Sequence, residues 1–263
     1  MNRDFLSEIV TSKHRAIAKP RATAKDLRNR ALLARKNCQP HRLRHALETA
    51  SPPIKIIAEF KRKSPSRGVI RADLSATDMA TAYERGGACA ISVLTDEEYF
   101  GGSIDDLAAV RAATQLSILR KDFLIDPVQI CEAAVAGADA ILLIASILDD
   151  SQLAQMRAIA EDEFGLDALI EVHSADDLLR AQNAGAKLIG VNNRDLRTFE
   201  VCLSTSERLI ANAPRDILMI SESGLQTPEQ LRHLRALGFR GFLIGETLMQ
   251  AADPAIALRN LMQ

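Results

Sequence analysis

Charged and amide residues stand at the ends of several apolar runs in this 263-residue sequence. They are Glu59, Lys61, Lys121, Glu171, Asn192 and Glu222. Burying an unpaired charge costs free energy, so a buried strand that ends on such a residue is expected to face a polar site. Lysine and glutamate side chains in one site can donate and accept protons. The pattern therefore predicts acid–base chemistry at the ends of strands.

Spacing and sequence context add detail to this prediction. Glu59 and Lys61 lie two residues apart, and the period of two in a strand places both on one face. Glu171 stands among apolar neighbours, and burial there would raise its pKa into the range of a general acid. Asn192 can orient a substrate without titrating.

The apolar runs are spaced like the strands of a β/α protein. We expect strands near 54–60, 88–94, 117–120, 140–144, 168–172, 188–192, 218–221 and 241–244. Amphipathic helices are expected between them, at 76–85, 104–113, 127–136, 149–164, 175–183, 204–211, 228–237 and 254–261. Glycine follows several of these helices, where it can take the left-handed conformation and return the chain to the sheet.

Eight alternating units favour an α/β fold that closes into a (β/α)8 TIM barrel. Such a barrel typically needs ~250 residues, and its catalytic groups lie at the C-terminal ends of the strands. An open doubly wound sheet is the alternative, but it would normally show a glycine-rich loop after the first strand. Lys61 to Ser66 occupy that place here. We divide the single domain into an N-terminal helical extension, residues 1–47, and a barrel, residues 48–263.

The loops after the last two strands carry the signature of a phosphate site. Ser223 and Gly224 follow the seventh strand, and Gly245 and Glu246 follow the eighth. Barrels bind phosphate at these places through backbone amides and the start of a short helix. We expect the side chain of Glu246 to turn away and Ser64 to add a hydroxyl.

The formal charge is divided unevenly along the chain. Residues 1–47 hold twelve Lys and Arg against three acids, whereas the remainder carries an excess of acids. A basic arm can bind nucleic acid, but no aromatic residues follow these charges as stacking platforms. The spacing of Phe5, Leu6, Ile9 and Val10 predicts an amphipathic helix instead. We expect the extension to cap the barrel and to bind no nucleic acid.

Composition disfavours several other classes of protein. No apolar run reaches the ~18 residues of a membrane-spanning helix. The four cysteines are widely spaced, and no His, Asp or Glu spacing indicates a metal site. We expect a cytoplasmic monomer with no membrane contact and no bound metal.

Several of these segments together resemble a known family. They are Glu59-Phe60-Lys61-Arg62-Lys63-Ser64-Pro65-Ser66, Leu94-Thr95-Asp96-Glu97-Glu98-Tyr99-Phe100-Gly101-Gly102-Ser103, Leu119-Arg120-Lys121-Asp122-Phe123, Glu171-Val172-His173, Asn192-Asn193-Arg194-Asp195-Leu196 and Ser221-Glu222-Ser223-Gly224. The chain resembles the indole-3-glycerol-phosphate synthases of tryptophan biosynthesis over its whole length. The resemblance implies a (β/α)8 barrel with extra N-terminal helices.

The resemblance also implies a reaction. It is the ring closure of 1-(2-carboxyphenylamino)-1-deoxyribulose 5-phosphate to indole-3-glycerol phosphate, with loss of CO2 and water and without a cofactor. Lys121 would protonate the ketone oxygen, and Lys61 would hold the carboxylate. Glu171 and Glu59 would move protons during dehydration, with their division of labour open.

Further roles follow from the same resemblance. Asn192 and Ser223 would position the substrate, and Glu222 would bind a sugar hydroxyl or hold Lys121. The remaining substrate-binding residues would be Phe100, Phe123 and Leu196 against the aromatic ring, Arg194 near the carboxylate, and Ser64, Gly224, Gly245 and Glu246 around the phosphate.

Two other readings of the residues remain open. Another sugar-phosphate barrel, such as an isomerase or epimerase, would explain the phosphate loops but not two lysines among three glutamates. A non-enzymatic scaffold would predict the loss of at least one charged strand end, and none is lost.

Overall fold

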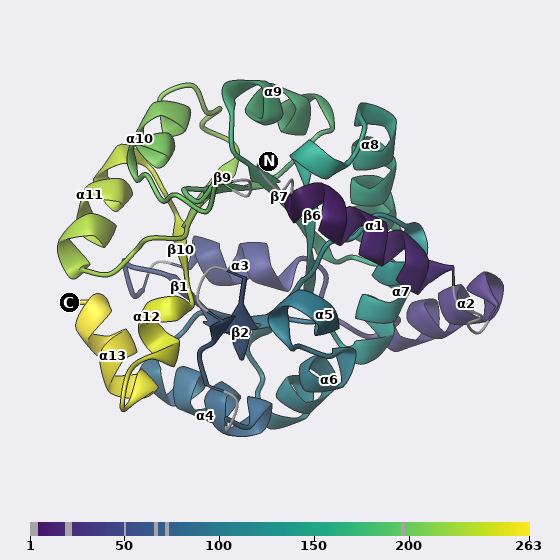
Figure 1. The fold of residues 1–263 in the computed structure, drawn as a ribbon, viewed down its shortest axis with the longest axis horizontal. Coiled ribbons are helices and arrows are strands. Elements are labelled where there is room, and N and C mark those ends of the chain that lie inside the picture. Colours follow the sequence, from purple (N-terminus) through teal and green to yellow (C-terminus); the bar gives the residue numbers. More distant parts are fainter. Residues whose placement is uncertain (1–4, 19–22, 50, 66–67, 72–73, 196–197) are drawn as a thin grey trace.

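The computed structural model describes residues 5–18, 23–49, 51–65, 68–71, 74–195 and 198–263. Eight parallel strands form a closed barrel in the order β1-β10-β9-β8-β7-β6-β5-β4, ringed by helices (Figure 1). The strands are β1 (Ile56–Phe60), β4 (Ala90–Leu94), β5 (Ser117–Lys121), β6 (Ala140–Ile144), β7 (Asp167–Val172), β8 (Leu188–Asn192), β9 (Leu218–Glu222) and β10 (Gly241–Ile244). The barrel predicted from the sequence is confirmed, with strand ends within two residues of those expected.

The outer helices also agree with the pattern. They are α4 (Ala76–Gly86), α6 (Ile104–Ala113), α7 (Pro127–Ala136), α8 (Asp150–Ala158), α9 (Ala175–Asn183), α10 (Ser204–Ile210), α11 (Pro228–Leu237) and α13 (Pro254–Leu261). The single helix expected over 149–164 is instead α8 followed by a π-helix, η2 (Ile159–Glu163). Asp149 lies outside the helix because its side chain caps the amide of Gln152.

Shorter elements fill the loops. The hairpin β2 (Lys63–Ser64) and β3 (Gly68–Val69) follows β1, and the remaining short helices are α5 (Glu97–Phe100), η1 (Ala145–Ile147) and α12 (Glu246–Met249). Gly87 and Gly137 end their helices with φ of 91°, the left-handed conformation expected there.

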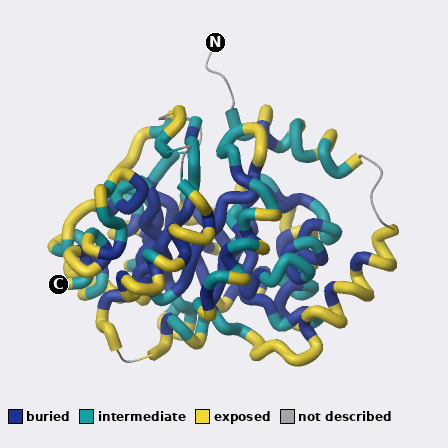
Figure 2. The backbone as a smooth tube through the Cα atoms, turned by 90° about the horizontal axis from the view of Figure 1, so that it is seen from below, coloured by how far each residue is buried: buried dark blue, intermediate teal, exposed yellow. Residues whose placement is uncertain are grey.

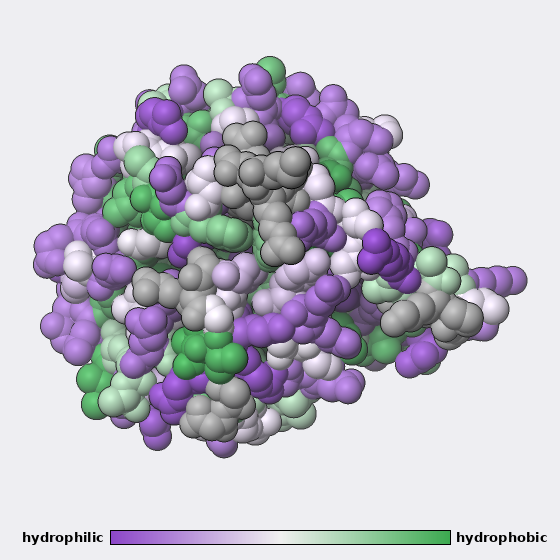
Figure 3. Space-filling model, viewed as in Figure 1, coloured by the Kyte–Doolittle hydropathy of each residue, from purple (hydrophilic) through white to green (hydrophobic). Residues whose placement is uncertain are grey.

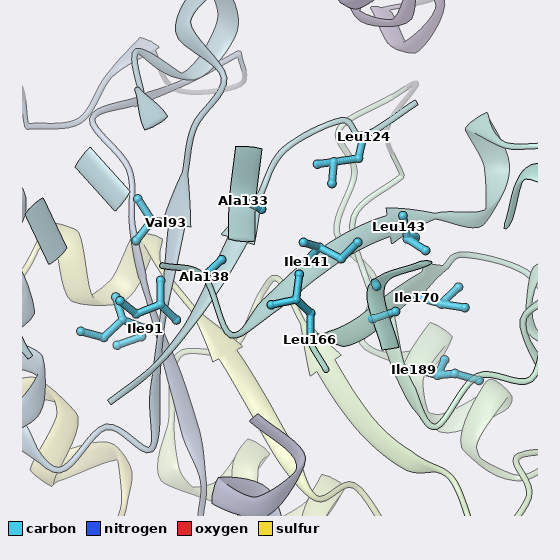
Figure 4. Packing of buried hydrophobic residues seen from close by; sticks show 14 of the residues in the cluster. Ile91, Val93, Leu124, Ala133, Ala138, Ile141, Leu143, Leu166, Ile170 and Ile189 are labelled. Atoms are coloured by element: carbon cyan, nitrogen blue, oxygen red, sulfur yellow. The ribbon is translucent and has the colours of Figure 1, made fainter. Parts of the chain in front are cut away.

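Alternation along each strand divides the core into two layers. On β6, Ile141 and Leu143 point outward and pack against the helices, as do Ile91 and Ile170 on their own strands (Figure 4). Leu142 points inward and joins the barrel interior. Figure 2 shows the buried residues gathered along the centre of the molecule, with exposed residues on the outer helices. The strands are therefore apolar on both faces, which explains their continuous apolar runs.

Three helices precede the barrel: α1 (Phe5–Ile17), α2 (Ala24–Arg35) and α3 (Arg42–Glu48). Leu43 and Leu47 of α3 join the interior cluster, so α3 closes the N-terminal end of the barrel. α1 lies at the opposite end, in front of the strands in Figure 1, where Ile9 joins the same interior cluster as Phe123. The amphipathic helix predicted from its apolar spacing is thus present.

Candidate active site

A cavity of about 470 Å³ opens at the C-terminal ends of the strands. The site residues predicted from the sequence that line it are Glu59, Lys61, Ser64, Phe100, Lys121, Phe123, Glu171, Asn192, Arg194, Glu222, Ser223, Gly224, Gly245 and Glu246. Leu196 lies outside the described residues. Figure 3 views the molecule from the same direction as Figure 1, and hydrophilic residues predominate on this face. The structure thus brings residues from distant strands into one site.

Lys121 lies at the centre of the charged groups. Its Nζ donates to Glu222 Oε2 at 2.7 Å and to Glu171 Oε2 at 3.0 Å. Burial would lower the pKa of Lys121, but the two carboxylates and the nearby Glu59 raise it above its ordinary value. Lys121 is therefore a protonated ammonium group at neutral pH and can act as an acid.

Glu171 differs from the sequence-based expectation. Burial does act to raise its pKa, but Lys121, His173 and an amide hydrogen bond from Asn192 together lower it below its ordinary value. The Asn192 amide donates to Glu171 Oε1 at 3.0 Å, and His173 Nε2 lies 3.4 Å from the same oxygen. The expectation of a raised pKa was wrong because Lys121, His173 and Asn192 face the carboxylate and outweigh the effect of its burial. The lowered pKa keeps Glu171 as an ionised carboxylate at neutral pH.

Glu222 is the carboxyl group with the raised pKa. Burial, together with the nearby Glu171 and Glu59, raises its pKa to about 7. The attraction of Lys121 lowers this pKa and only partly offsets the rise. Lys121 thus pairs with two buried carboxylates. Their different surroundings lower the pKa of Glu171 and raise that of Glu222. Such a separation marks groups with different roles in proton transfer.

Glu59 and Lys61 form a second ion pair, as their spacing predicts. Lys61 Nζ lies 2.6 Å from Glu59 Oε1, so the two side chains share one face of the strand end. The hydroxyl of Tyr83 donates to the backbone carbonyl of Glu59 at 2.9 Å and holds this end of β1. The pair provides a cation beside the Lys121 centre.

The loops expected to bind phosphate have unusual backbone conformations. Ser223 and Gly224 have φ of 67° and 77°, so two consecutive residues adopt the left-handed conformation. α12 begins at Glu246, and the Thr247 hydroxyl donates to Leu225 O at 3.0 Å, tying the two loops together. Glu246 Oε2 lies 3.6 Å from Arg194 Nη2, which offsets its negative charge.

Apolar residues form the walls and floor of the cavity. The rings of Phe100 and Phe123 lie with centroids 6.1 Å apart. Phe199 and Val201 also line the cavity, as do Leu142 and other inward residues of the barrel, and sequence reasoning missed them. The apolar run of β6 ends without a charged residue that would mark it as part of a site. Only the alternation of inward and outward side chains along this strand could have indicated that Leu142 faces the cavity.

The family model of indole-3-glycerol phosphate synthase matches residues 6–261. The chain belongs to the indole-3-glycerol phosphate synthase family. Members of this family are carboxy-lyases of tryptophan biosynthesis, and this chain is such an enzyme.

Individual family members match along nearly the whole chain. The synthases of Desulfosudis oleivorans and Leptothrix cholodnii are 42% and 43% identical over 260 residues, covering 98% of each chain. That of Carboxydothermus hydrogenoformans is 48% identical over 226 residues, covering 85% of each. Thiamine phosphate pyrophosphorylase from Pyrococcus furiosus aligns with a TM-score of 0.59 and 17% identity, covering 80% of this chain and 94% of that chain, which supports the barrel fold alone.

A lysine that the sequence analysis did not assign to the site forms ion pairs with acids next to the cavity. Lys13 of α1 lies 2.6 Å from Asp122 and 2.8 Å from Asp96. Asp122 directly follows Lys121 and accepts a hydrogen bond from the Phe123 amide. Sequence reasoning missed Lys13, although it falls four residues after Ile9 on the buried face of the helix.

No group of three or more His, Cys, Asp and Glu side chains among the described residues could hold a metal ion. No helix in the described ranges is long and apolar enough to cross a membrane.

Proposed function

We propose that this synthase closes the indole ring of 1-(2-carboxyphenylamino)-1-deoxyribulose 5-phosphate with the residues of the cavity described above. The observation that carries the proposal is the position of Lys121, a protonated ammonium group held between Glu171 and Glu222 in the mouth of the barrel. Family membership supports a sugar-phosphate substrate. The cavity contains both a charged half and an apolar half, as such a substrate requires.

The phosphate would bind between the two loops that follow β9 and β10. Ser223 and Gly224 form one side, and Gly245 with the start of α12 forms the other. Backbone amides at a helix start favour an anion. Ser64 lines the same cavity and would add its hydroxyl.

The anthranilate ring would lie against the apolar wall. Phe100 and Phe123 supply flat surfaces, and Phe199 completes the lining. Lys61 would bind the ring carboxylate, since it is the cation of the second ion pair. Arg194 would assist it from the neighbouring loop.

Ring closure joins the carbon that bears the carboxylate to the ketone carbon of the sugar. Lys121 would donate a proton to the ketone oxygen as this bond forms. Loss of CO2 then returns its bonding electron pair to the ring and restores aromaticity. The substrate nitrogen activates the attacking carbon, so no further group is required for this step.

Dehydration completes the indole. The hydroxyl formed in the first step would take up a proton passed to it through Glu59 and leave as water, and a proton would leave the adjacent carbon next to nitrogen. Glu171 would accept this proton, because its lowered pKa keeps it ionised. Glu59 would assist in moving protons, Asn192 would orient the substrate, and Glu222 would hold Lys121 or bind a sugar hydroxyl.

Incubation of the purified protein with this substrate tests the proposal through the appearance of indole fluorescence. We expect product with no added cofactor, and a much higher KM for the same compound without its phosphate. Folded protein that produces no fluorescence would overturn the proposed reaction. An unchanged KM without the phosphate would overturn the phosphate site. The cytoplasmic location, the monomeric state and the division into residues 1–47 and 48–263 stay predictions.

A further inference from the structure

Gly190 occupies an unusual place in the barrel interior. It lies on β8 between Leu188 and Asn192, and it pairs with Glu171 across the ladder to β7. Leu188 belongs to the interior cluster and Asn192 lines the cavity, so the period of two places Gly190 on the inward face. Its φ lies outside the left-handed region, so the backbone does not require glycine there.

A side chain at Gly190 would collide with a catalytic carboxylate. A Cβ built there would lie 2.0 Å from Glu222 Oε1 and 3.1 Å from Glu222 Cδ. Real Cβ atoms essentially never come within 3.0 Å of such an atom, so the oxygen would have to move by about 1 Å. Glu222 Oε1 is buried and has no hydrogen-bond partner in the described part of the chain, so it lies there because Gly190 leaves the space.

The other oxygen of the same carboxylate binds Lys121. Glu222 Oε2 lies 2.7 Å from Lys121 Nζ, and the two oxygens cannot move independently. A methyl group at Gly190 would therefore displace the Glu222–Lys121 pair. Its next neighbour would be the flexible end of Leu169, with Cδ1 at 3.2 Å.

We propose that Gly190 is a positioning residue, whose missing side chain sets the place of Glu222 and, through it, of Lys121. The inference rests on the proposed roles of these two residues. Gly245 stands in a similar relation to Glu59, since a Cβ there would lie 2.3 Å from Glu59 Oε1. Gly245 is also the N-cap residue of α12, so a substitution there could disturb that helix, and Gly190 gives the more specific test.

The experiment compares Gly190→Ala, Glu222→Ala and the double variant with the wild type, by kcat and KM separately. A misplacement of about 1 Å can reduce a rate ~10²-fold, so we expect kcat of Gly190→Ala to fall by about that factor with little change in KM. In the Glu222→Ala background, the same methyl group should change kcat less than about twofold, because residues that act through one group are non-additive.

Gly241→Ala is the matched control. It is also a buried strand glycine, but its Cβ would meet the flexible end of Leu47 at 2.7 Å, at the opposite end of the barrel. We expect it to affect stability and leave kcat unchanged. Wild-type kcat in Gly190→Ala, or a loss no larger than that of Gly241→Ala, would overturn the inference.

The remaining outcomes separate this inference from the proposed function. If Gly190→Ala reduces kcat equally in the wild type and in the Glu222→Ala background, the proposed role of Gly190 is contradicted and that of Glu222 is not. Full activity of Glu222→Ala contradicts the role of Glu222. If Gly190→Ala fails to fold but the double variant folds, the collision with Glu222 is supported; if neither folds, the methyl group meets something other than Glu222 and the inference fails.

Discussion

The central lysine has two carboxylate partners that are not equivalent. Glu171 receives hydrogen bonds from Lys121 and Asn192, whereas one oxygen of Glu222 has no partner among the described residues. The same desolvation therefore leads to opposite net shifts, a lowered pKa for Glu171 and a raised pKa for Glu222. The sequence predicted which residues gather here, but it could not predict these shifts, because partners from other strands decide them.

Replacement of Lys121 tests its role as the acid. Lys121→Ala should reduce kcat ~10²–10⁴-fold, the usual contribution of a general acid, with a small change in KM. Lys61→Ala should lower kcat and raise KM, because Lys61 is proposed to bind the carboxylate in the ground state. Steady-state kinetics distinguish the two patterns. Similar kcat and KM changes in both variants would contradict the assignment.

Replacement of Glu222 should reveal the cost of its burial. Folding raises its pKa from 4.5 to about 7, so the folded state holds this proton more tightly than the unfolded state. Stability therefore falls as pH rises through this window, and above it the full penalty remains. Glu222→Gln should be more stable than the wild type by about 3 kcal/mol at pH 8 and equal to it near pH 4. Urea unfolding at both pH values measures this difference, and a difference independent of pH would contradict it.

At the scale of elements, the strands were the easiest to predict. Each is buried on both faces, so it reads as a short apolar run bounded by polar or glycine residues. One helix was expected over 149–164, but the structure has α8 followed by a π-helix. No pattern in the sequence indicated this change. The docking of α1 could be predicted only in part, because its apolar spacing was visible but the partners of Lys13 lie on other elements.

Lys13 should determine whether α1 stays docked. Its ammonium group is the shared partner of Asp96 and Asp122, and Asp122 keeps a lowered pKa through Arg120 and Lys13 despite its burial. Lys13→Met would leave buried carboxylates without this partner, a change that typically costs ~3–5 kcal/mol. Because these ion pairs hold α1 against the barrel, we expect faster hydrogen exchange of its amides and a lower free energy of unfolding in this variant.

A matched variant separates this effect from the gain of an apolar side chain. Lys25 is an exposed residue of α2, so Lys25→Met introduces the same methionine without removing a buried charge. Hydrogen exchange over α1 should be unchanged in this control. Equal protection of α1 in Lys13→Met and the wild type would show that the ion pairs do not hold the helix.

At the scale of the molecule, the proposed catalytic groups gather at one end of the barrel, and the ion pairs at the opposite end are expected to affect stability alone. The mouth holds the ion pairs of the cavity and the Lys13 pairs of α1, and the opposite end holds the ion pairs that α2 and α3 make with the barrel. Asp139 and Asp167, at the starts of β6 and β7, bind arginines of α2 and α3. The uneven charge of the sequence predicted this attraction between extension and barrel, but not which acids receive it, since Asp139 and Asp167 are separated from their partners by about a hundred residues.

Asp139 should contribute strongly to the stability of this end of the barrel. It is buried and pairs with Arg42 and Arg111 at 3.0 Å and with Arg35 at 3.5 Å, so one carboxylate joins α2, α3 and α6. Asp139→Asn removes the charge from a buried cluster of arginines and should lower the free energy of unfolding by ~3–5 kcal/mol. Guanidinium unfolding measures this loss.

The exposed pair of Asp150 with Arg180 supplies the comparison, since the Asp150 side chain is 80% exposed. Asp150→Asn should change stability by no more than ~1 kcal/mol, as is usual for a surface ion pair. Both variants should keep the kcat and KM of the wild type under conditions where they are folded, because catalytic groups in such barrels lie at the other end. A reduced kcat in folded Asp139→Asn would contradict this expectation. It would show that the ion pairs of α2 and α3 influence the site at the opposite end of the barrel.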